Sequence, residues 1–147
     1  MAELLFRSLH ILVALALVGS VLIQNLALSA QLSVEDTQNL RKINKIFGMT
    51  AALVLGLGLV LLMGVGSKPA AFYGSNPVFH AKMGLFVLLA VLVVPTTRFL
   101  KRATADADGN IALPGGIRLC FRLQLTLALI IPVLAYLMAR GIGITAN

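Results

Sequence analysis

Residues 4–28 read LLFRSLHILVALALVGSVLIQNLAL, a nearly unbroken run of apolar side chains. The run shows no alternation with a period of two residues, which excludes a strand of a membrane β-barrel. Its length suits a helix that crosses the hydrocarbon core of a bilayer, for which about 20 residues are needed. In lipid such a segment must be helical, because the bilayer offers backbone groups no hydrogen-bond partners. We therefore expect a retained transmembrane helix over 4–28, although Leu28-Ser29-Ala30 loosely resembles a signal-peptide cleavage site.

Three further apolar stretches follow, and they cover residues 43–65, 77–100 and 117–138. The connections between the stretches are short, so successive helices are expected to run antiparallel. In the first connection, Ser33, Glu35 and Asp36 predict a cap for a second helix that starts before the bilayer. The sequence thus predicts an all-α integral membrane protein. It forms a single domain over 1–147, an antiparallel up-down bundle of four transmembrane helices.

The composition agrees with a membrane protein. Of the 147 residues, 59% are apolar and only 12% are charged, and the mean hydropathy is +0.98. A soluble domain is roughly 45–50% apolar and about 25% charged. These values exclude a soluble enzyme, a disordered tail and a fibrous repeat. The single cysteine, Cys120, cannot form an internal disulfide, and no Cys/His spacing predicts a zinc site.

The distribution of charge predicts the orientation in the membrane. A net charge of +7 by itself suits a nucleic-acid partner, but the cations flank the apolar segments, so we expect no nucleic acid. One side of the predicted bundle collects eight cations: Arg41, Lys42, Lys45, Arg98, Lys101, Arg102, Arg118 and Arg122. The other side has four: Arg7, Lys68, Lys82 and Arg140. The positive-inside rule then places both termini and the 66–77 loop in the periplasm, with the chain in a bacterial inner (cytoplasmic) membrane.

The two histidines share one depth in this topology. His10 lies about six residues into the first helix, roughly 9 Å below its outer end, and His80 lies about three residues into the third, roughly 5 Å below the same surface. In an up-down bundle these two helices are diagonal, so their inner faces oppose each other across the core. Two opposed imidazoles are the arrangement that a six-coordinate haem iron needs. The pair predicts axial ligands for a haem.

Two cations extend this hypothesis to the carboxylates of the haem. Arg7 lies one turn from His10 on the same helical face, and Lys82 lies near the same membrane surface. Cations at the water-facing edge pair with carboxylates. Lys82 follows His80 by two residues and so points away from the His80 face, whereas the planar guanidinium of Arg7 suits a carboxylate. We therefore expect Arg7 to be the stronger carboxylate partner and Lys82 the weaker one.

Other interpretations stay open at this point. A histidine close to a helix end can simply be an interfacial or hydrogen-bonding residue. Gln24, on the same helical stripe as His10, favours hydrogen bonding between helices. Gly48, Ala52 and Gly56 form a ridge of small residues on the second helix, which is typical of close packing against another helix. That helix can belong to this bundle, to a second copy of the chain or to a larger membrane complex.

Residues 71–102, AFYGSNPVFHAKMGLFVLLAVLVVPTTRFLKR, resemble an uncharacterised bacterial family of small four-helix inner-membrane proteins. The run FY-x-x-NP-x-FH-x-K, leading into a helix with a Pro-Thr exit, carries most of this resemblance. Leu9-His10 in the first helix also fits the family pattern. The resemblance extends from the N-terminus to Arg102 and implies a fold rather than an activity.

A fainter similarity points to the HemJ-type protoporphyrinogen oxidases and related copper-resistance-type membrane proteins. These pair a histidine in the first helix with a His/Lys cluster opening the third, matched here by His10, His80 and Lys82. Because the HemJ type is thought to bind haem b, the similarity implies a porphyrin site. The chain departs from that type in having no tryptophan and no Arg-Asn-Glu-Pro stretch before its last helix.

Three functional hypotheses follow from the sequence. The first is a protein that binds haem b near the outer leaflet and transfers electrons to or from a quinone or a redox protein. The second is a cofactor-free accessory or assembly subunit that packs on a larger membrane complex or forms a homo-oligomer. The third is a HemJ-like porphyrin oxidase. No catalytic residue is assigned, and the sequence leaves open whether the protein is an enzyme.

Overall fold

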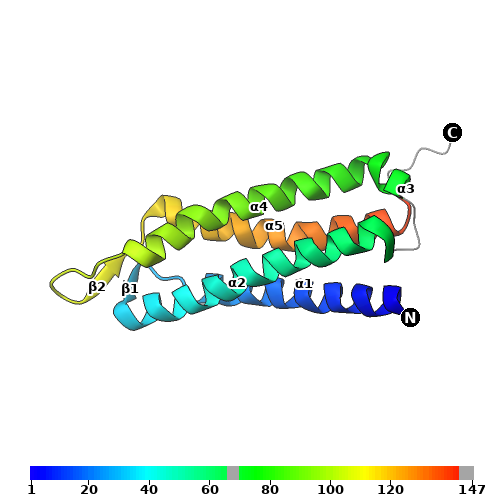
Figure 1. The fold of residues 1–147 in the computed structure, drawn as a ribbon. Helices are drawn as coiled ribbons and strands as arrows, with labels where there is room; N and C mark the ends of the chain where they lie inside the picture. The colour runs from blue at the N-terminus through cyan, green and yellow to red at the C-terminus, as the bar shows by residue number, and fades with distance from the viewer. Residues whose placement is uncertain (66–69, 143–147) are drawn as a thin grey trace.

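The protein is a bundle of four long helices, described by a computed structural model for residues 1–65 and 70–142. The long helices are α1 (Ala2–Leu26), α2 (Val34–Val60), α4 (Pro77–Arg102) and α5 (Gly115–Ala139). Figure 1 shows them side by side along one axis, with α1 and α2 on one side and α4 and α5 on the other. All four are long and apolar enough to cross a membrane. The predicted all-α fold with four membrane-spanning helices is therefore confirmed.

The order of the helices around the bundle follows the order in the chain. α1 packs against α2 and α5, and α4 packs against the same two helices, so that α1 and α4 are diagonal. This agrees with the expected up-down arrangement. It brings the start of α1, the start of α4 and the end of α5 to one end of the bundle.

Short elements close the two ends of the bundle. At one end, which we call the α3 end, α2 continues into a π-helical turn, η1 (Leu61–Val65), and the short helix α3 (Ala70–Gly74) precedes α4. At the other end, which we call the strand end, β1 (Gln31–Ser33) pairs antiparallel with β2 (Asn110–Ala112). Of the 66–77 loop predicted from the sequence, Gly66, Lys68 and Pro69 lie outside the described residues.

The strand pair was not predicted, because each strand is only three residues long and its partner lies in a distant connection. In the pair, Leu32 lies opposite Ile111, and both side chains are buried. They join an apolar cluster that fills the strand end of the bundle, together with Leu40, Leu100, Leu113 and Phe121. The strands therefore tie the α1–α2 connection to the α4–α5 connection through buried side chains as well as backbone hydrogen bonds.

The start of α2 confirms the predicted cap. The Ser33 hydroxyl accepts a hydrogen bond from the Asp36 backbone N–H at 3.0 Å, and the Asp36 carboxylate accepts one from the Ser33 N–H at 3.1 Å. This reciprocal capping box satisfies two backbone donors that a helix start leaves free. α2 consequently begins at Val34, outside the apolar stretch of 43–65.

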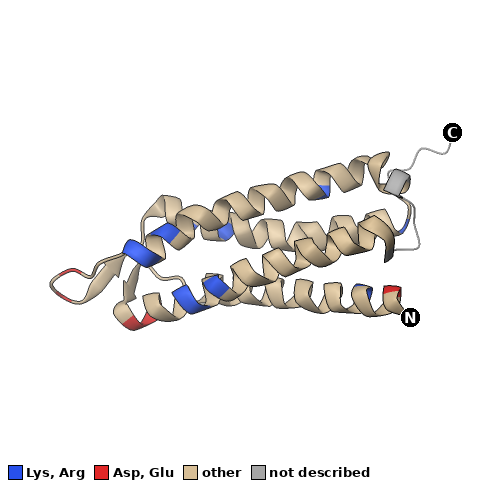
Figure 2. Ribbon diagram, viewed as in Figure 1, with Lys and Arg blue, Asp and Glu red and all other residues tan. Residues whose placement is uncertain are grey.

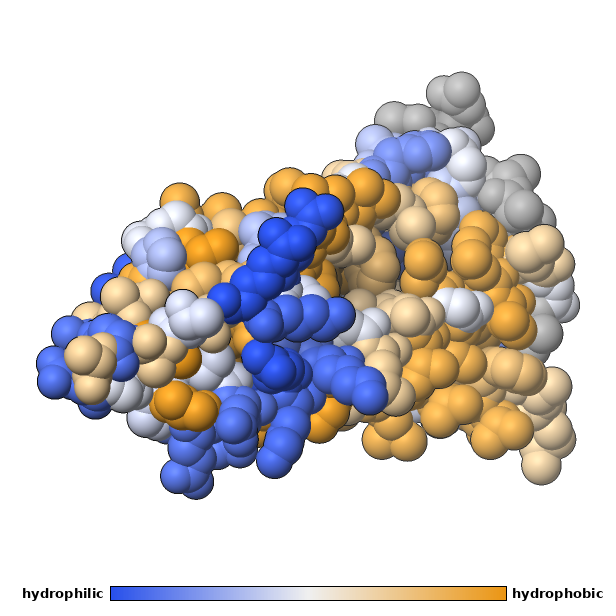
Figure 3. All heavy atoms as spheres, turned by 60° about the vertical axis from the view of Figure 1, so that its left-hand side comes forward, coloured by the Kyte–Doolittle hydropathy of each residue, from blue (hydrophilic) through white to orange (hydrophobic). Residues whose placement is uncertain are grey.

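The surface of the bundle separates lipid-facing from water-facing parts. Figure 2 shows that Lys and Arg gather at the strand end, with fewer at the α3 end, and that the middle of the bundle carries almost none. Figure 3 brings the strand end forward, where hydrophilic side chains gather beside a mostly hydrophobic surface. Many large apolar side chains are exposed in the middle of the helices, among them Leu15, Leu53, Val91 and Leu129. Lipid covers such side chains in a membrane.

A layer of buried polar side chains crosses the core in the half nearer the strand end. Gln24 on α1 donates to Asn44 Oδ1 on α2 at 3.3 Å, and Asn44 Nδ2 donates to Thr97 Oγ1 on α4 at 2.7 Å. On the other side, Gln124 on α5 donates to the Leu92 carbonyl at 2.8 Å and to Thr96 Oγ1 at 3.2 Å. We call these residues the polar layer. It links all four helices, and the hydrogen bonding between helices that was expected of Gln24 is present.

The polar layer generates a stability prediction. Asn44→Ala removes the amide that joins α1 to α4, and it leaves Gln24 Nε2 without its acceptor. Because hydrogen bonds between helices in membranes contribute about 0.6 kcal/mol on average and about 1.7 kcal/mol at most, we expect the free energy of unfolding to fall by about 1 kcal/mol. Unfolding in mixed micelles, followed by circular dichroism, measures this change.

Thr126→Ala is the matched control. The Thr126 hydroxyl is exposed and donates only to the Arg122 carbonyl of its own helix. We expect this variant to unfold like the unmodified protein. Equal losses in the two variants would show that bonds between the helices do not stabilise the bundle.

Candidate functional site

The predicted site residues all belong to the α3 end. His10 and Arg7 come from the first turns of α1, and His80 and Lys82 from the first turns of α4. Asn76 fixes the start of α4, because its Oδ1 accepts from the Val78 N–H at 2.9 Å and its Nδ2 donates to the Ile142 carbonyl at 3.4 Å. The start of α4 is thereby joined to the chain just after α5.

His10 lies on the inner stripe of α1, in register with the buried side chains of Leu17, Val21 and Gln24. Its ring packs on α2 at Gly58, where an added Cβ atom would lie 3.3 Å from Cε1 and 3.8 Å from Nδ1. The ring also lies within hydrogen-bonding reach of the backbone of Val54, one turn earlier on α2. Nδ1 is buried and has no hydrogen-bond partner among the residues that the structure describes. His10 therefore offers an unused nitrogen atom inside the apolar part of the bundle.

Lys82 faces the interior from α4. It is half-buried and stands in register with the buried side chains of Phe86, Leu89 and Thr96. Its charge is near enough to act electrostatically on the His10 imidazole. Its Nζ atom lies 5.4 Å from the centre of the Phe79 ring, a cation–π distance. The structure thus brings together His10 and Lys82 from two diagonal helices.

His80 lies differently from the sequence-based expectation. Its side chain is exposed, and its Nε2 is hydrogen-bonded to the Gly74 carbonyl at 2.8 Å. Its ring lies edge-on to Phe79, with 5.7 Å between the centres. Since residues two apart on a helix point in different directions, the inward position of Lys82 turns His80 outward. The two imidazoles therefore do not oppose each other across the core in this structure.

Arg7 has an acidic partner on its own helix. Its side chain is exposed, and Nη2 forms an ion pair with the Glu3 carboxylate at 2.5 Å, one turn earlier on α1. Helix neighbours of opposite charge at this spacing attract each other. The guanidinium that was expected to be the stronger carboxylate partner is thus already paired with Glu3 in this structure.

A small cavity lies one turn below His10, toward the centre of the bundle. Its volume is about 30 Å³, and side chains from all four helices line it, including Ala14, Val54, Phe86 and Pro132. A cavity of this size and apolar lining is large enough for about one water molecule. A macrocycle does not fit inside it, so a large planar ligand near His10 requires the helices to separate at the α3 end.

Sequence reasoning missed two features of the bundle interior. Gly58 was not recognised as the residue that makes room for the His10 ring, because only the structure shows which residue of α2 faces His10. Asn44 and Gln124 were not singled out, although both stand inside or beside apolar stretches. A polar side chain in such a place is a signal of function or of bonding between helices.

Four apolar helices with charged ends define a small polytopic membrane protein. The chain belongs to the family described as predicted membrane protein (DUF2214), which matches residues 2–143. This confirms the resemblance to a small membrane-protein family and extends it through the fourth helix. Searches of curated proteins and of solved structures gave no significant match.

Proposed function

We propose that this protein binds a b-type haem at the α3 end and takes part in electron transfer. The observation that carries the proposal is the unpartnered, buried Nδ1 of His10. Ionisable side chains inside a membrane are rare, and they mark functional sites by default. An imidazole with an unused nitrogen atom is a common haem ligand.

Besides an axial ligand, a haem needs a cation for its carboxylates, and a six-coordinate haem also needs a second ligand. Lys82, half-buried near His10, is the cation that would pair with a haem carboxylate. Gly58 lets the His10 ring lie directly against α2. His80 becomes a second ligand only if its ring leaves the Gly74 carbonyl, so His10 is the principal ligand in this proposal. A bound haem would supply one-electron redox chemistry, and a quinone or a redox protein would be the exchange partner.

A second candidate function is that of a cofactor-free subunit in a larger membrane assembly. The ridge of Gly48, Ala52 and Gly56 favours it. An added Cβ atom would meet nothing within 4 Å at either glycine, and Ala52 is exposed. The ridge is therefore not covered by another helix of the described bundle. Small residues on a lipid-facing ridge allow close approach of a helix from another chain.

Absorption spectroscopy of the purified protein separates the two candidates. Haem binding predicts a b-type spectrum that shifts on reduction with dithionite, and His10→Ala should abolish it or reduce it at least tenfold in occupancy. His80→Ala should leave most of the haem bound, because that ring is held by Gly74. A colourless, folded protein from haem-replete cells would reject the haem proposal and favour the cofactor-free subunit.

The reduction potential of the haem-loaded protein tests the roles proposed for Lys82 and Arg7. Positive charge near the iron favours the reduced form, so its removal lowers the reduction potential. We expect a fall on the order of tens of millivolts for Lys82→Gln. The fall for Arg7→Gln should be smaller, because Glu3 already neutralises Arg7. Redox titrations measure both, and a larger fall for Arg7→Gln would remove Lys82 from the site.

We also propose that the strand end faces the cytoplasm of a bacterium and the α3 end the periplasm. Support comes from the eight-to-four distribution of Lys and Arg in the sequence, since cations accumulate on the cytoplasmic side of inner-membrane proteins. Both termini would then be periplasmic, and His10 would lie in the outer leaflet.

Cysteine labelling in intact cells tests this orientation. In a Cys120→Ser background, Ser75→Cys lies at the α3 end and Asp108→Cys lies in the exposed turn before β2. An impermeant thiol reagent should label the cysteine at 75 in intact cells and the cysteine at 108 only after permeabilisation. The reverse pattern would invert the proposed orientation and leave the haem proposal untouched.

A further inference from the structure

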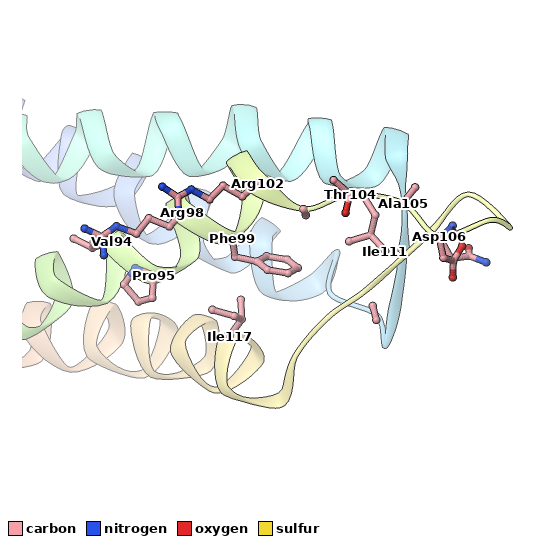
Figure 4. A pocket seen from close by; sticks show the side chains of 13 residues that line it. Val94, Pro95, Arg98, Phe99, Arg102, Thr104, Ala105, Asp106, Ile111 and Ile117 are labelled. Carbon is pink, nitrogen blue, oxygen red and sulfur yellow. Dashed lines mark hydrogen bonds between the residues drawn. The ribbon is translucent and has the colours of Figure 1, made fainter.

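A groove at the strand end lies apart from the histidine site. It has a volume of about 870 Å³ and is open to the surroundings. The end of α4, the segment that follows it, β2 and the first turn of α5 form its walls. Figure 4 shows it from close by. The groove therefore lies where the apolar part of the bundle meets its charged end.

Two arginines of the groove are free to bind a ligand. Arg98 and Arg102 are one turn apart on α4, both exposed, and neither has a hydrogen bond or an ion pair among residues 1–65 and 70–142. Arg41, close by on α2, is different, because its Nε and Nη2 donate to the Leu100 carbonyl at 3.1 and 2.6 Å. Arg41 thus satisfies a carbonyl group in the last turn of α4. Arg98 and Arg102 form no such bond within the described residues.

The remaining lining is mostly apolar. Figure 4 shows the two arginine side chains extending in the same direction along α4, beside Val94, with Phe99 and Ile117 toward α5. Asp106 is the acid of the lining, and Figure 4 places it at the opposite end of the groove from Arg98. Its Oδ1 accepts hydrogen bonds from the backbone N–H groups of Asp108 and Asn110, so it belongs to the turn before β2.

We propose that this groove binds one anionic phospholipid. The phosphodiester headgroup is held between Arg98 and Arg102, because the planar guanidinium matches phosphate oxygens with paired hydrogen bonds. An acyl chain follows the apolar wall at Val94 and Pro95 toward the middle of the bilayer. Basic pockets of this kind at the ends of membrane helices are suited to anionic headgroups.

The combination of charge and apolar wall selects a lipid over a soluble anion. A free phosphate uses only the arginines, whereas a phospholipid also covers the apolar lining. The surface that continues the groove along α4, including Val87 and Val91, is exposed and apolar. A lipid held there is continuous with the bilayer around it.

Native mass spectrometry of the full-length protein in detergent tests the proposal. Titration with phosphatidylglycerol should give one tightly bound lipid at concentrations where phosphatidylcholine does not bind. Each cation near an anionic headgroup contributes roughly fivefold to affinity, equivalent to about 1 kcal/mol. Arg98→Gln/Arg102→Gln should therefore weaken phosphatidylglycerol binding on the order of 25-fold, and Arg98→Lys/Arg102→Lys by less.

Lys42→Gln/Lys45→Gln is the matched control, since it removes the same charge from exposed positions on α2 at the same end, outside the groove. We expect a loss below about threefold for this pair. Inorganic phosphate in large excess should not displace the lipid. Equal losses in both pairs, equal binding of phosphatidylcholine, or displacement by phosphate would each overturn the proposal. Melting curves that match the unmodified protein establish that the variants are folded.

Discussion

The amide of Asn44 is the interaction on which the arrangement of the bundle depends most. Inside a bilayer, apolar side chains gain little by leaving lipid for one another, so packing and hydrogen bonds decide how helices associate. Asn44 joins α1 and α4 from its place on α2, and Gln124 joins α5 to α4. Each bond fixes both the rotation and the height of a helix.

The α3 end shows the consequence of this rotation. With Thr96 and Thr97 of α4 turned toward the amides, the inner stripe of the same helix reaches Lys82 and not His80. On α1, the stripe that contains Gln24 also carries His10 inward. The polar layer and the histidine site therefore lie on the same inner faces of α1 and α4, at different heights along the bundle.

Much of the fold could be predicted from the sequence, because lipid leaves an apolar segment of sufficient length no alternative to a helix. The Ser33 cap and the diagonal placement of α1 and α4 followed from local chemistry and short connections. The strand pair did not, because Leu32 and Ile111 meet only after the helices have packed. The outward position of His80 was not predictable either. The rotation of α4 depends on Asn44 and Gln124, which lie on other helices, and the spacing of residues within α4 does not show these partners. The Glu3–Arg7 pair was readable from its spacing, and the functional interpretation overlooked it.

The pairing of β1 with β2 makes the two ends of the molecule mechanically unequal. At the strand end, backbone bonds and a buried apolar cluster fasten the α1–α2 half to the α4–α5 half. At the other end, the chain itself joins the halves, because η1 follows α2 and α3 precedes α4. The two halves are therefore fastened at both ends, by a noncovalent strand pair at one and by the backbone at the other. Only the fastening at the strand end can open without breaking the chain, so loss of the β1–β2 pair would leave the halves joined by helix packing and by the connection at the α3 end.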